Sequence, residues 1–468
     1  MHAGALAARP RGGLRARQAL PAALRFGERA FAFLALSTLC GTPLLLLQIT
    51  GLAEGGTATR LVKAFTLVPI AGITVAAILA NPRAFIGSLR QNVPVAALVV
   101  LLFGSALWSE VPELTLRRAG TLTTTILFGI YLSMRFSTKE ALALVCWALL
   151  GVAIASVLVV LIWPHRGVGS GASAGAWQGI YPHKQMLGLH AALGTFTCAV
   201  RALDLQKRSL LAWSGTALCA ALVLLSESAT SLLVLGLSLA TLPLLRVLRR
   251  KDLFALAIAA IAFCVAISVL FVVLMQGEAV LAGIGKDSTL TGRLPLWQYV
   301  LDEIGRRPLL GYGYNGFWTG LDGPSAYVLV VTDGWYPWHA HNGWLQLSLD
   351  SGAIGVLLLV MGYFTAIRRT FRGRSESWSE GIWPVACLVF LLLLSIAETV
   401  LMRPSTIFTA LFAAAAFTGA RESGLAGGRP RTRFRNGVTL SAATRRIAAR
   451  GQHAGRQGAR PSRSEGTP

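Results

Sequence analysis

The chain has 468 residues, of which 54% are hydrophobic and only 13% are charged, and its mean hydropathy is +0.60. A soluble domain carries about 25% charged residues. The apolar runs are continuous and lack the residue-by-residue alternation of a membrane β-barrel. Composition therefore excludes both of these classes and predicts an all-α fold, a polytopic transmembrane helical bundle.

The net charge of +23 is concentrated at the two ends of the chain. Residues 1–30 contain six Arg and one acidic residue, and residues 421–468 contain eleven Arg and two acidic residues. Both segments are rich in Gly, Ala and Pro and lack apolar periodicity. They are predicted to be disordered cytoplasmic tails that contact anionic lipid, so no nucleic-acid partner is expected.

Between the tails, residues 31–420 are predicted to form one transmembrane domain. A span needs about 20 apolar residues, and about twelve such runs occur in chain order. They lie near 31–50, 61–80, 92–108, 119–134, 141–163, 185–200, 209–225, 229–246, 253–275, 344–367, 382–400 and 405–420.

Charge orients these spans. With the N-terminus inside, every predicted inner connection contains Arg or Lys, as cytoplasmic loops do. The chain is therefore expected to be a multi-pass protein with both termini in the cytoplasm. No internal repeat is visible.

One predicted outer connection is long. Residues 276–343, between spans nine and ten, form a large external loop. Within it, Leu294, Trp297, Leu301 and Ile304 share one helical face, which predicts an amphipathic helix over about 293–305 on the outer membrane surface.

The tenth span is preceded by the polar sequence His339-Ala340-His341-Asn342. The unsatisfied N–H groups at the start of a helix favour an anion. His341 shares a face with Gly352 and Gly355, which would let another helix pack closely beneath it. His341 can act as a base near neutral pH, although an interfacial histidine is an equal interpretation and a metal ligand a third. No further ligand at the usual spacing completes a metal site.

Several cations are predicted on the outer side, where cations are uncommon. A cluster of them would suit a diphosphate, with lipid headgroup contact as the alternative. The candidate substrate-binding residues are Arg118, His183, Lys184, Arg293 and Arg403, together with His339 and Asn342 next to the candidate base.

Two further features need an interpretation. The sequence GYGYNG at 311–316 fits GxGxxG, but no βαβ unit surrounds it, so a flexible loop that stacks on sugars is expected instead. Glu398, an acid inside a predicted span, is expected to be functional or paired, with Arg403 as a candidate partner. The six cysteines all lie in apolar runs without metal spacing and are expected to be small core residues.

Together these residues resemble the O-antigen ligase and O-antigen/exopolysaccharide polymerase family of bacterial inner-membrane proteins. His341-Asn342, nine residues, and then Gly352-x-x-Gly355 match the H[NSQ]-x9-GxxG pattern of the ligases. Four stretches resemble the polymerase branch for acidic exopolysaccharides: LWSEVPELTLRRA (107–119), GIYPHKQMLG (179–188), LTGRLPLW (290–297) and RRPLLGYGYNGFW (306–318). The resemblance covers about residues 30–420.

The resemblance implies a metal-independent membrane glycosyltransferase that uses no cofactor. Such an enzyme transfers a glycan from an undecaprenyl-diphosphate carrier to a hydroxyl of an acceptor glycan on the periplasmic face. It implies that His341 deprotonates the acceptor and that Arg293 holds the leaving diphosphate, with Arg118 and Lys184. Other polysaccharide-assembly proteins are possible partners.

Three functions remain open. A polymerase is favoured over a ligase that acts on a lipid A core, because Val356-Leu357-Leu358 follow the GxxG where ligases often have hydroxyl residues. A twelve-span transporter or flippase is the alternative from another class.

Overall fold

The computed structural model describes residues 21–43, 45, 57–204, 209–250, 293–321, 323–332, 334–372 and 378–426. In these ranges the regular secondary structure is helical, and one isolated bridge, between Val168 and Trp177, is the β-type pairing they contain. One compact unit extends to Leu425, and a second comprises residues 426–468. The longer helices are α2 (Ala22–Leu39), α4 (Thr57–Leu79), α5 (Pro82–Leu89), α6 (Val93–Gly104), α7 (Pro112–Arg135), α8 (Thr138–Ile162), α10 (Lys184–Asp204), α11 (Leu210–Leu225), α12 (Ala229–Arg250), α14 (Arg293–Arg306), α16 (Gly343–Arg372), α17 (Trp378–Ala397) and α18 (Ile407–Ala426).

Local sequence explains where several helices begin. The Ser137 side chain accepts the backbone N–H of Glu140, and the Glu140 side chain accepts that of Ser137, which is a capping box at the start of α8. Proline stands in the first turn of α5, α6 and α7, where its missing N–H costs nothing. The long apolar runs then continue each helix without polar interruption.

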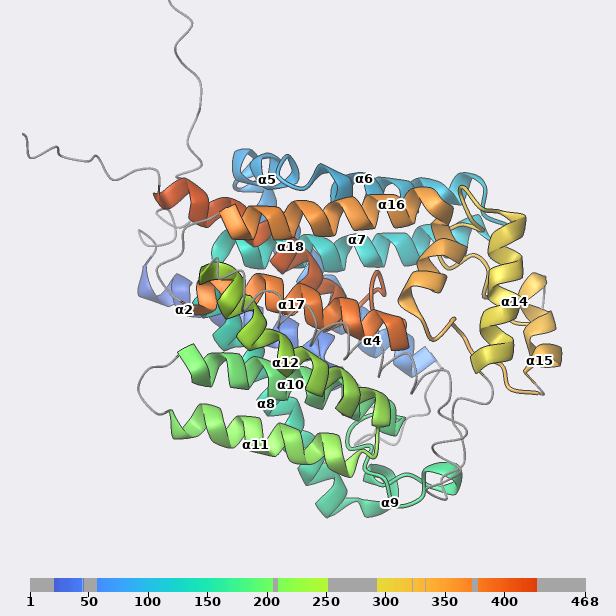
Figure 1. The fold of residues 1–468 in the computed structure, drawn as a ribbon, viewed down its shortest axis with the longest axis horizontal. Helices are drawn as coiled ribbons and strands as arrows, with labels where there is room; N and C mark the ends of the chain where they lie inside the picture. The colour runs from blue at the N-terminus through green and yellow to red at the C-terminus, as the bar shows by residue number, and fades with distance from the viewer. Residues whose placement is uncertain are drawn as a thin grey trace, which may run out of the picture. The chain divides into compact units, whose positions relative to one another are not determined.

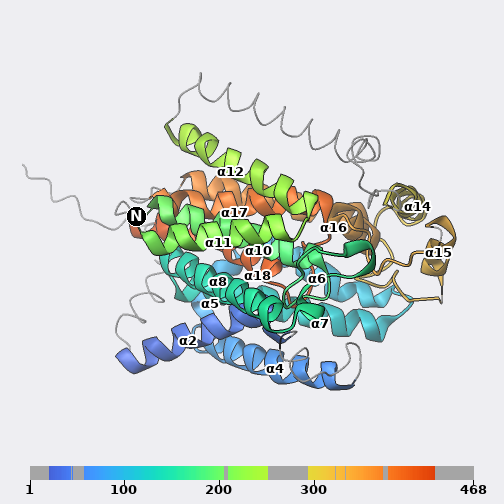
Figure 2. The ribbon, with the colours of Figure 1, turned by 90° about the horizontal axis from the view of Figure 1, so that it is seen from below.

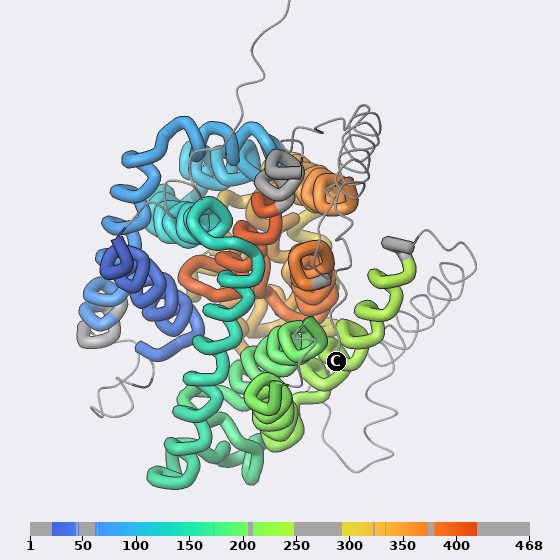
Figure 3. Tube along the Cα trace, turned by 90° about the vertical axis from the view of Figure 1, so that its left-hand side faces the viewer, coloured from blue at the N-terminus to red at the C-terminus, as the bar shows by residue number. Residues whose placement is uncertain are grey.

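Most of the long helices run side by side through the unit, whereas α14 crosses one end of it next to α15 (Val328–Val331) (Figure 1). The same placement of α14 and α15 is seen after a quarter turn (Figure 2). Seen along the helices, α10, α17 and α18 lie inside the ring formed by the others (Figure 3). Phe196, Phe390 and Phe412 of these three helices are fully buried.

The opposite end of the unit is held by polar contacts of basic residues. Arg29 pairs with Glu140 at 2.9 Å, and Arg135 pairs with Glu28. Arg369 donates to the backbone oxygen of Gln91 at 2.8 Å. Predicted inner connections therefore meet at one end of the helices, away from α14 and α15.

Helix α16 is broken at Gly352, where φ is 61° and ψ is −163°. The loop after α14 fills the break. The carbonyl oxygens of Pro308 and Leu309 accept the N–H groups of Ala353 (2.8 Å) and Ile354 (3.4 Å), and the N–H of Tyr312 donates to Leu349 (2.8 Å). The backbone groups freed by the break are thus satisfied by the loop.

Glycine is required at the contact between the loop and the break. A Cβ on Gly352 would lie 2.2 Å from the carbonyl carbon of Leu309, and a Cβ on Gly311 would lie 2.4 Å from the carbonyl oxygen of Leu349. The expected helix–helix contact at Gly352 is therefore wrong, because a loop occupies that place. Gly355 does face a helix, since its Cβ would lie 3.6 Å from Leu98 of α6.

Each predicted span that falls within the described residues corresponds to a helix. Among the described residues, five helices are long and apolar enough to cross a membrane, or up to six if the pair Ala64–Leu79 and Pro82–Leu89, bent by 98°, counts as one span. Three more apolar helices are shorter. The predicted span at 253–275 and most of the external loop before Arg293 lie outside the described residues, so the number twelve stays a prediction.

Three boundaries and faces differ from the sequence prediction. Helix α2 begins at Ala22 and α18 continues to Ala426, so helix extends into both predicted tails. Helix α14 exists, but its buried face is different from the one predicted. It consists of Arg293, Leu296, Val300 and Glu303, whereas Leu301 is exposed. This face packs against the protein, because Arg293 and Glu303 find polar partners there.

The GYGYNG loop is packed rather than free. Tyr312, Tyr314, Phe317 and Trp318 are all buried, and the Tyr314 hydroxyl donates to the carbonyl oxygen of Met402. The expectation of a flexible sugar-stacking loop is therefore wrong. The glycines are needed because Gly311 and Gly313 adopt φ values of 63° and 90°.

Candidate active site

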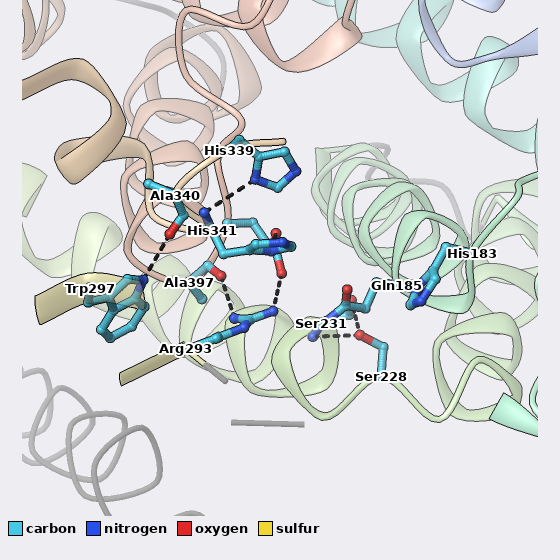
Figure 4. Close-up of polar contacts among 11 residues, drawn as sticks. His183, Gln185, Ser228, Ser231, Arg293, Trp297, His339, Ala340, His341 and Ala397 are labelled. Atoms are coloured by element: carbon cyan, nitrogen blue, oxygen red, sulfur yellow. Dashed lines mark hydrogen bonds and ion pairs between the residues drawn. The ribbon is translucent and has the colours of Figure 1, made fainter. Parts of the chain in front are cut away.

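The turn that contains the histidine pair is fixed from two sides. Trp297 of α14 donates its indole N–H to the carbonyl oxygen of Ala340 at 2.8 Å. The backbone N–H of Ala340 donates to Oε1 of Gln346, on α16, at 3.0 Å. Because Ala340 lies between His339 and His341, these two bonds set the position of both rings (Figure 4).

His341 has a left-handed backbone, with φ of 49°. This conformation is uncommon outside glycine and is found mostly at functional sites. Its Nδ1 lies 3.2 Å from Oε2 of Glu398. A carboxylate oxygen can only accept a hydrogen bond, so we assign the proton to Nδ1. The Nε2 atom then carries a lone pair, which is the form that a general base requires.

Glu398 is shared between two cationic or ionisable partners. Its Oε1 lies 2.7 Å from Nη2 of Arg293, and its Oε2 faces His341. Burial acts to raise the pKa of Glu398, but the hydrogen bond with His341 and the positive charge of Arg293 outweigh burial, so the pKa lies below its ordinary value. The carboxylate is therefore ionised at neutral pH and joins the guanidinium to the imidazole.

Arg293 is the first residue of α14 and is only 5% exposed. Besides its ion pair, its Nη1 donates to the carbonyl oxygen of Ala397 at 2.9 Å. A guanidinium has five N–H donors, so two of them fasten α14 to the end of α17. The expected pairing of Glu398 with Arg403 is wrong, because Arg293 takes that place.

The ring of His339 packs closely against that of His341, at a tilt of 48°. The ring centroids of His339 and His341 are 4.1 Å apart, and Nδ1 of His339 accepts the backbone N–H of His341 at 3.2 Å. Burial, followed by the positive charges of His341, Arg403 and Arg293, places the pKa of His339 well below its ordinary value. His339 is therefore neutral, with its proton on Nε2.

Asn342 caps α16. Its Oδ1 accepts the backbone N–H groups of Trp344 (2.9 Å) and Leu345 (3.1 Å). These N–H groups are therefore unavailable to a ligand, and the expected open anion site at this helix start is wrong.

His183 and Lys184 stand at the start of α10, and Figure 4 shows the labelled His183 to the right of His341 and Arg293. Partial desolvation and then the charge of Lys184 lower the pKa of His183, and the charges of Glu398 and His341 also act on it. Lys184 has no hydrogen-bond or ion-pair partner among the described residues. It is thus a cation available to a ligand.

The remaining predicted residues line a cavity of about 230 Å³ next to His339. Arg118, from the start of α7, and Arg403, from the loop after α17, both contribute to its wall. Arg118 donates to the carbonyl oxygen of Asn315 at 2.7 Å, whereas the exposed Arg403 guanidinium has no hydrogen bond or ion pair within the described chain. Seven of the eight predicted residues thus fall into an inner group around Glu398, a cavity group and the pair at the start of α10, and the eighth, Asn342, caps α16.

Strained backbone is concentrated here. The described residues other than glycine with positive φ are Glu227, Asn315, His341, Met402 and Ser405. Asn315 and Met402 line the cavity, and His341 faces Glu398. Such conformations persist where surrounding contacts enforce them, and they gather at ligand sites.

Sequence reasoning missed the carboxylate that orients His341. It also missed Gln346 and Trp297, which position the turn. Glu398 carried a usable signal, because an acid in an apolar run needs a partner, but the choice among distant cations requires the fold. Within the described residues, no group of three or more His, Cys, Asp or Glu side chains could hold a metal ion.

Comparison with known proteins shows which proteins this sequence is similar to. Residues 214–360, which include Arg293, His341 and Gly352, match the family model described as O-antigen ligase. The exopolysaccharide production protein ExoQ of Rhizobium meliloti is 27% identical over 337 residues, which is 68% of this chain and 75% of ExoQ. Shorter matches are found to proteins assigned provisionally as polysaccharide ligases. The protein from Rickettsia conorii is 34% identical over 14% of this chain and 17% of its own length, and that from Rickettsia felis is 33% identical over 18% and 23%.

Proposed function

We propose that this chain, which is similar to O-antigen ligases and to an exopolysaccharide production protein, is a glycan polymerase of that family. It would transfer an undecaprenyl-diphosphate-linked oligosaccharide to a hydroxyl of an acceptor glycan. The observation that carries this proposal is the shared carboxylate: Glu398 contacts His341 at 3.2 Å and Arg293 at 2.7 Å. A base and a cation are thereby held on one rigid group.

The bare Nε2 of His341 would act as the general base. It takes the proton of the acceptor hydroxyl while that oxygen attacks the anomeric carbon of the donor sugar. The bond between the anomeric carbon and the phosphate oxygen breaks, and undecaprenyl diphosphate leaves with the electron pair. Glu398 stabilises the imidazolium that forms, as a carboxylate does beside a catalytic histidine.

Negative charge develops on the departing diphosphate, so nearby fixed cations lower the barrier. Lys184 is available for this role because no described residue pairs with it. Arg293 retains N–H donors beyond the two that bind Ala397 and Glu398. We propose that these two residues, with His183, receive the diphosphate, and that no metal ion takes part.

The arrangement of the helices also indicates which side of the membrane the site would face. The site lies at the α14 end of the unit, opposite the end where the basic connections meet. Basic connections mark the cytoplasmic side, so the site would face the periplasm from the bacterial inner membrane, with both termini in the cytoplasm. A lipid-linked donor could reach it from the bilayer.

A ligase is the second candidate, because the matching family model carries that description. The residues Val356-Leu357-Leu358 after the GxxG favour polymerase, and the similarity to an exopolysaccharide production protein and to polysaccharide ligases supports glycan assembly over transport. The test is reconstitution of the purified protein in liposomes with a diphospho-undecaprenyl oligosaccharide. A ladder of products is expected. A single transfer, seen only when a lipid A core is added, would identify a ligase, and no transfer in either case would contradict both.

A further inference from the structure

Thr399, which lines the cavity beside His339, carries a buried hydroxyl that has no partner among the described residues. Oγ1 of Thr399 is inaccessible to solvent and makes no hydrogen bond among the described residues, and Thr399 is only 6% exposed. A buried polar group normally finds a partner, so this hydroxyl is an observation that points to a ligand in the cavity.

The wall of the cavity mixes hydrogen-bonding groups of both kinds with apolar surface. Arg118 and Arg403 can only donate, the carboxylate of Asp350 accepts, and the Gln346 amide does both. Leu401, Met402 and the exposed indole of Trp338 supply the apolar part. Trp338 is 66% exposed, so its ring face is free for contact.

This mixture fits a sugar better than a diphosphate. A sugar ring has hydroxyls that donate and accept, and C–H faces that pack on apolar and aromatic surface. A diphosphate only accepts hydrogen bonds and does not need Asp350 or an apolar wall. The carboxyl oxygen Oδ1 of Asp350 already accepts from Asn315 and Gln346, so this atom offers a diphosphate no donor.

The cavity also lies where an acceptor would be needed. His339 lines it, and the ring of His339 is 4.1 Å, between centroids, from that of His341. A sugar in the cavity would therefore hold a hydroxyl near the base. In Figure 4, His183 lies to the right of His341, and His339 lies above it. A donor bound near the start of α10 and an acceptor in the cavity beside His339 would therefore approach His341 from different directions.

We infer that this cavity binds the acceptor glycan through its terminal sugar. The sugar would pack on Trp338 and bond to Thr399, and Arg118 and Arg403 would bind glycan hydroxyls or carboxylates rather than the diphosphate. This inference rests on the proposed function, because the acceptor is defined by that reaction.

The experiment measures binding without turnover. The repeat oligosaccharide is released from the carrier lipid by mild acid and titrated into the detergent-purified protein, with saturation-transfer NMR as the readout. We expect saturable binding. Thr399→Val, which removes the hydroxyl and keeps the shape, should weaken it by about 3–10-fold, the effect of one hydrogen bond. Trp338→Ala should weaken it by about tenfold.

The matched control is Thr365→Val, at an exposed position of α16 whose hydroxyl bonds only to its own helix, and it should bind like wild type. Inorganic pyrophosphate is titrated in parallel. If Thr399→Val and Trp338→Ala weaken pyrophosphate instead, or if the wild-type protein does not bind the oligosaccharide, the acceptor site is refuted even when transfer activity is present. Normal oligosaccharide binding without any transfer by liposome-reconstituted protein would instead refute the polymerase and leave the sugar site standing.

Discussion

Glu398 and Asp350 are both buried carboxylic acids near the histidine turn, but their partners differ. Glu398 contacts Arg293 and His341, both of which can carry a positive charge. Asp350 accepts from two neutral amides, the backbone N–H of Asn315 at 3.0 Å and the side chain of Gln346 at 2.9 Å. Either set of partners satisfies a buried carboxyl group, but the two arrangements have different roles.

The partners of each acid show what it does. A carboxylate between a guanidinium and an imidazole stays ionised and can respond to a proton on the ring. A carboxyl group bonded by amides organises backbone, and Asp350 ties the loop at Asn315 to the broken helix α16. Two buried acids on the two sides of the histidine turn thus have separate roles, one chemical and one structural.

His341→Ala should show the largest effect. Loss of a general base lowers the rate by about 10²–10⁴-fold, whereas the Arg293–Glu398 ion pair remains and the fold should stay intact. Product formation in liposomes and thermal unfolding in detergent measure the two consequences. Activity near that of wild type would show that the group formed by His341, Glu398 and Arg293 has no chemical role.

Gly352→Ala should damage the architecture instead. The added methyl group would lie 2.2 Å from the carbonyl carbon of Leu309, and φ is 61° there. Overpacking costs about 1–3 kcal/mol, and a left-handed residue other than glycine costs about 1–2 kcal/mol more. The unfolding midpoint should fall. Gly236→Ala in α12 is the control, because nothing lies within 4 Å of its added methyl group, and it should be neutral or slightly stabilising.

Glu398→Gln removes the negative charge and keeps the shape. The loss of charged hydrogen bonds costs about 1.5–3 kcal/mol at neutral pH. The sign with pH follows from the lowered pKa of Glu398: its contribution is complete above the ordinary value of about 4.3 and is lost as the pH falls through the lower folded value. Unfolding midpoints of wild type and variant should therefore differ at pH 7 and converge in acid. A constant difference across this range would contradict the ion pair.

Asp350→Asn is the matched substitution at the other acid and should have the smallest effect. The new side chain can still accept from Asn315 and Gln346 through its remaining oxygen, so the unfolding free energy should change by less than about 1 kcal/mol. The unfolding midpoint measures this against Glu398→Gln. A loss as large as that of Glu398→Gln would show that the two acids are not distinct.

The sequence predicted the all-α membrane class and the family, because continuous apolar runs and the His341–Gly355 spacing are local features. The structure places His341 and Arg293 against one shared carboxylate, but the sequence assigned that carboxylate, Glu398, to Arg403. Arg403 is five residues away in the chain and Arg293 is 105 residues away, so proximity in sequence favoured the wrong partner. Long-range pairing of this kind depends on how α14 crosses the ends of α16 and α17.

The conformation of the glycine–tyrosine loop at 311–316 also could not be predicted without the fold. Glycines and tyrosines at 311–316 suggested mobility, because glycine permits many conformations. The same freedom is used here for a single conformation, with Gly311 against Leu349 and Tyr314 bonded to Met402. Only the break in α16 reveals why, and a non-helical Gly352 cannot be distinguished from a packing glycine by spacing alone.

The break in α16 also gives a meaning to the nine residues between Asn342 and Gly352. Asn342 fixes where the helix starts, and the contacts of Pro308 and Leu309 fix the position of the break at Gly352. The number of residues between these two points is therefore fixed as well. One extra residue inside it would rotate the capped end by about 100° and lengthen it by about 1.5 Å. Nδ1 of His341 would then no longer face Oε2 of Glu398. The length of this segment is therefore as essential as its composition.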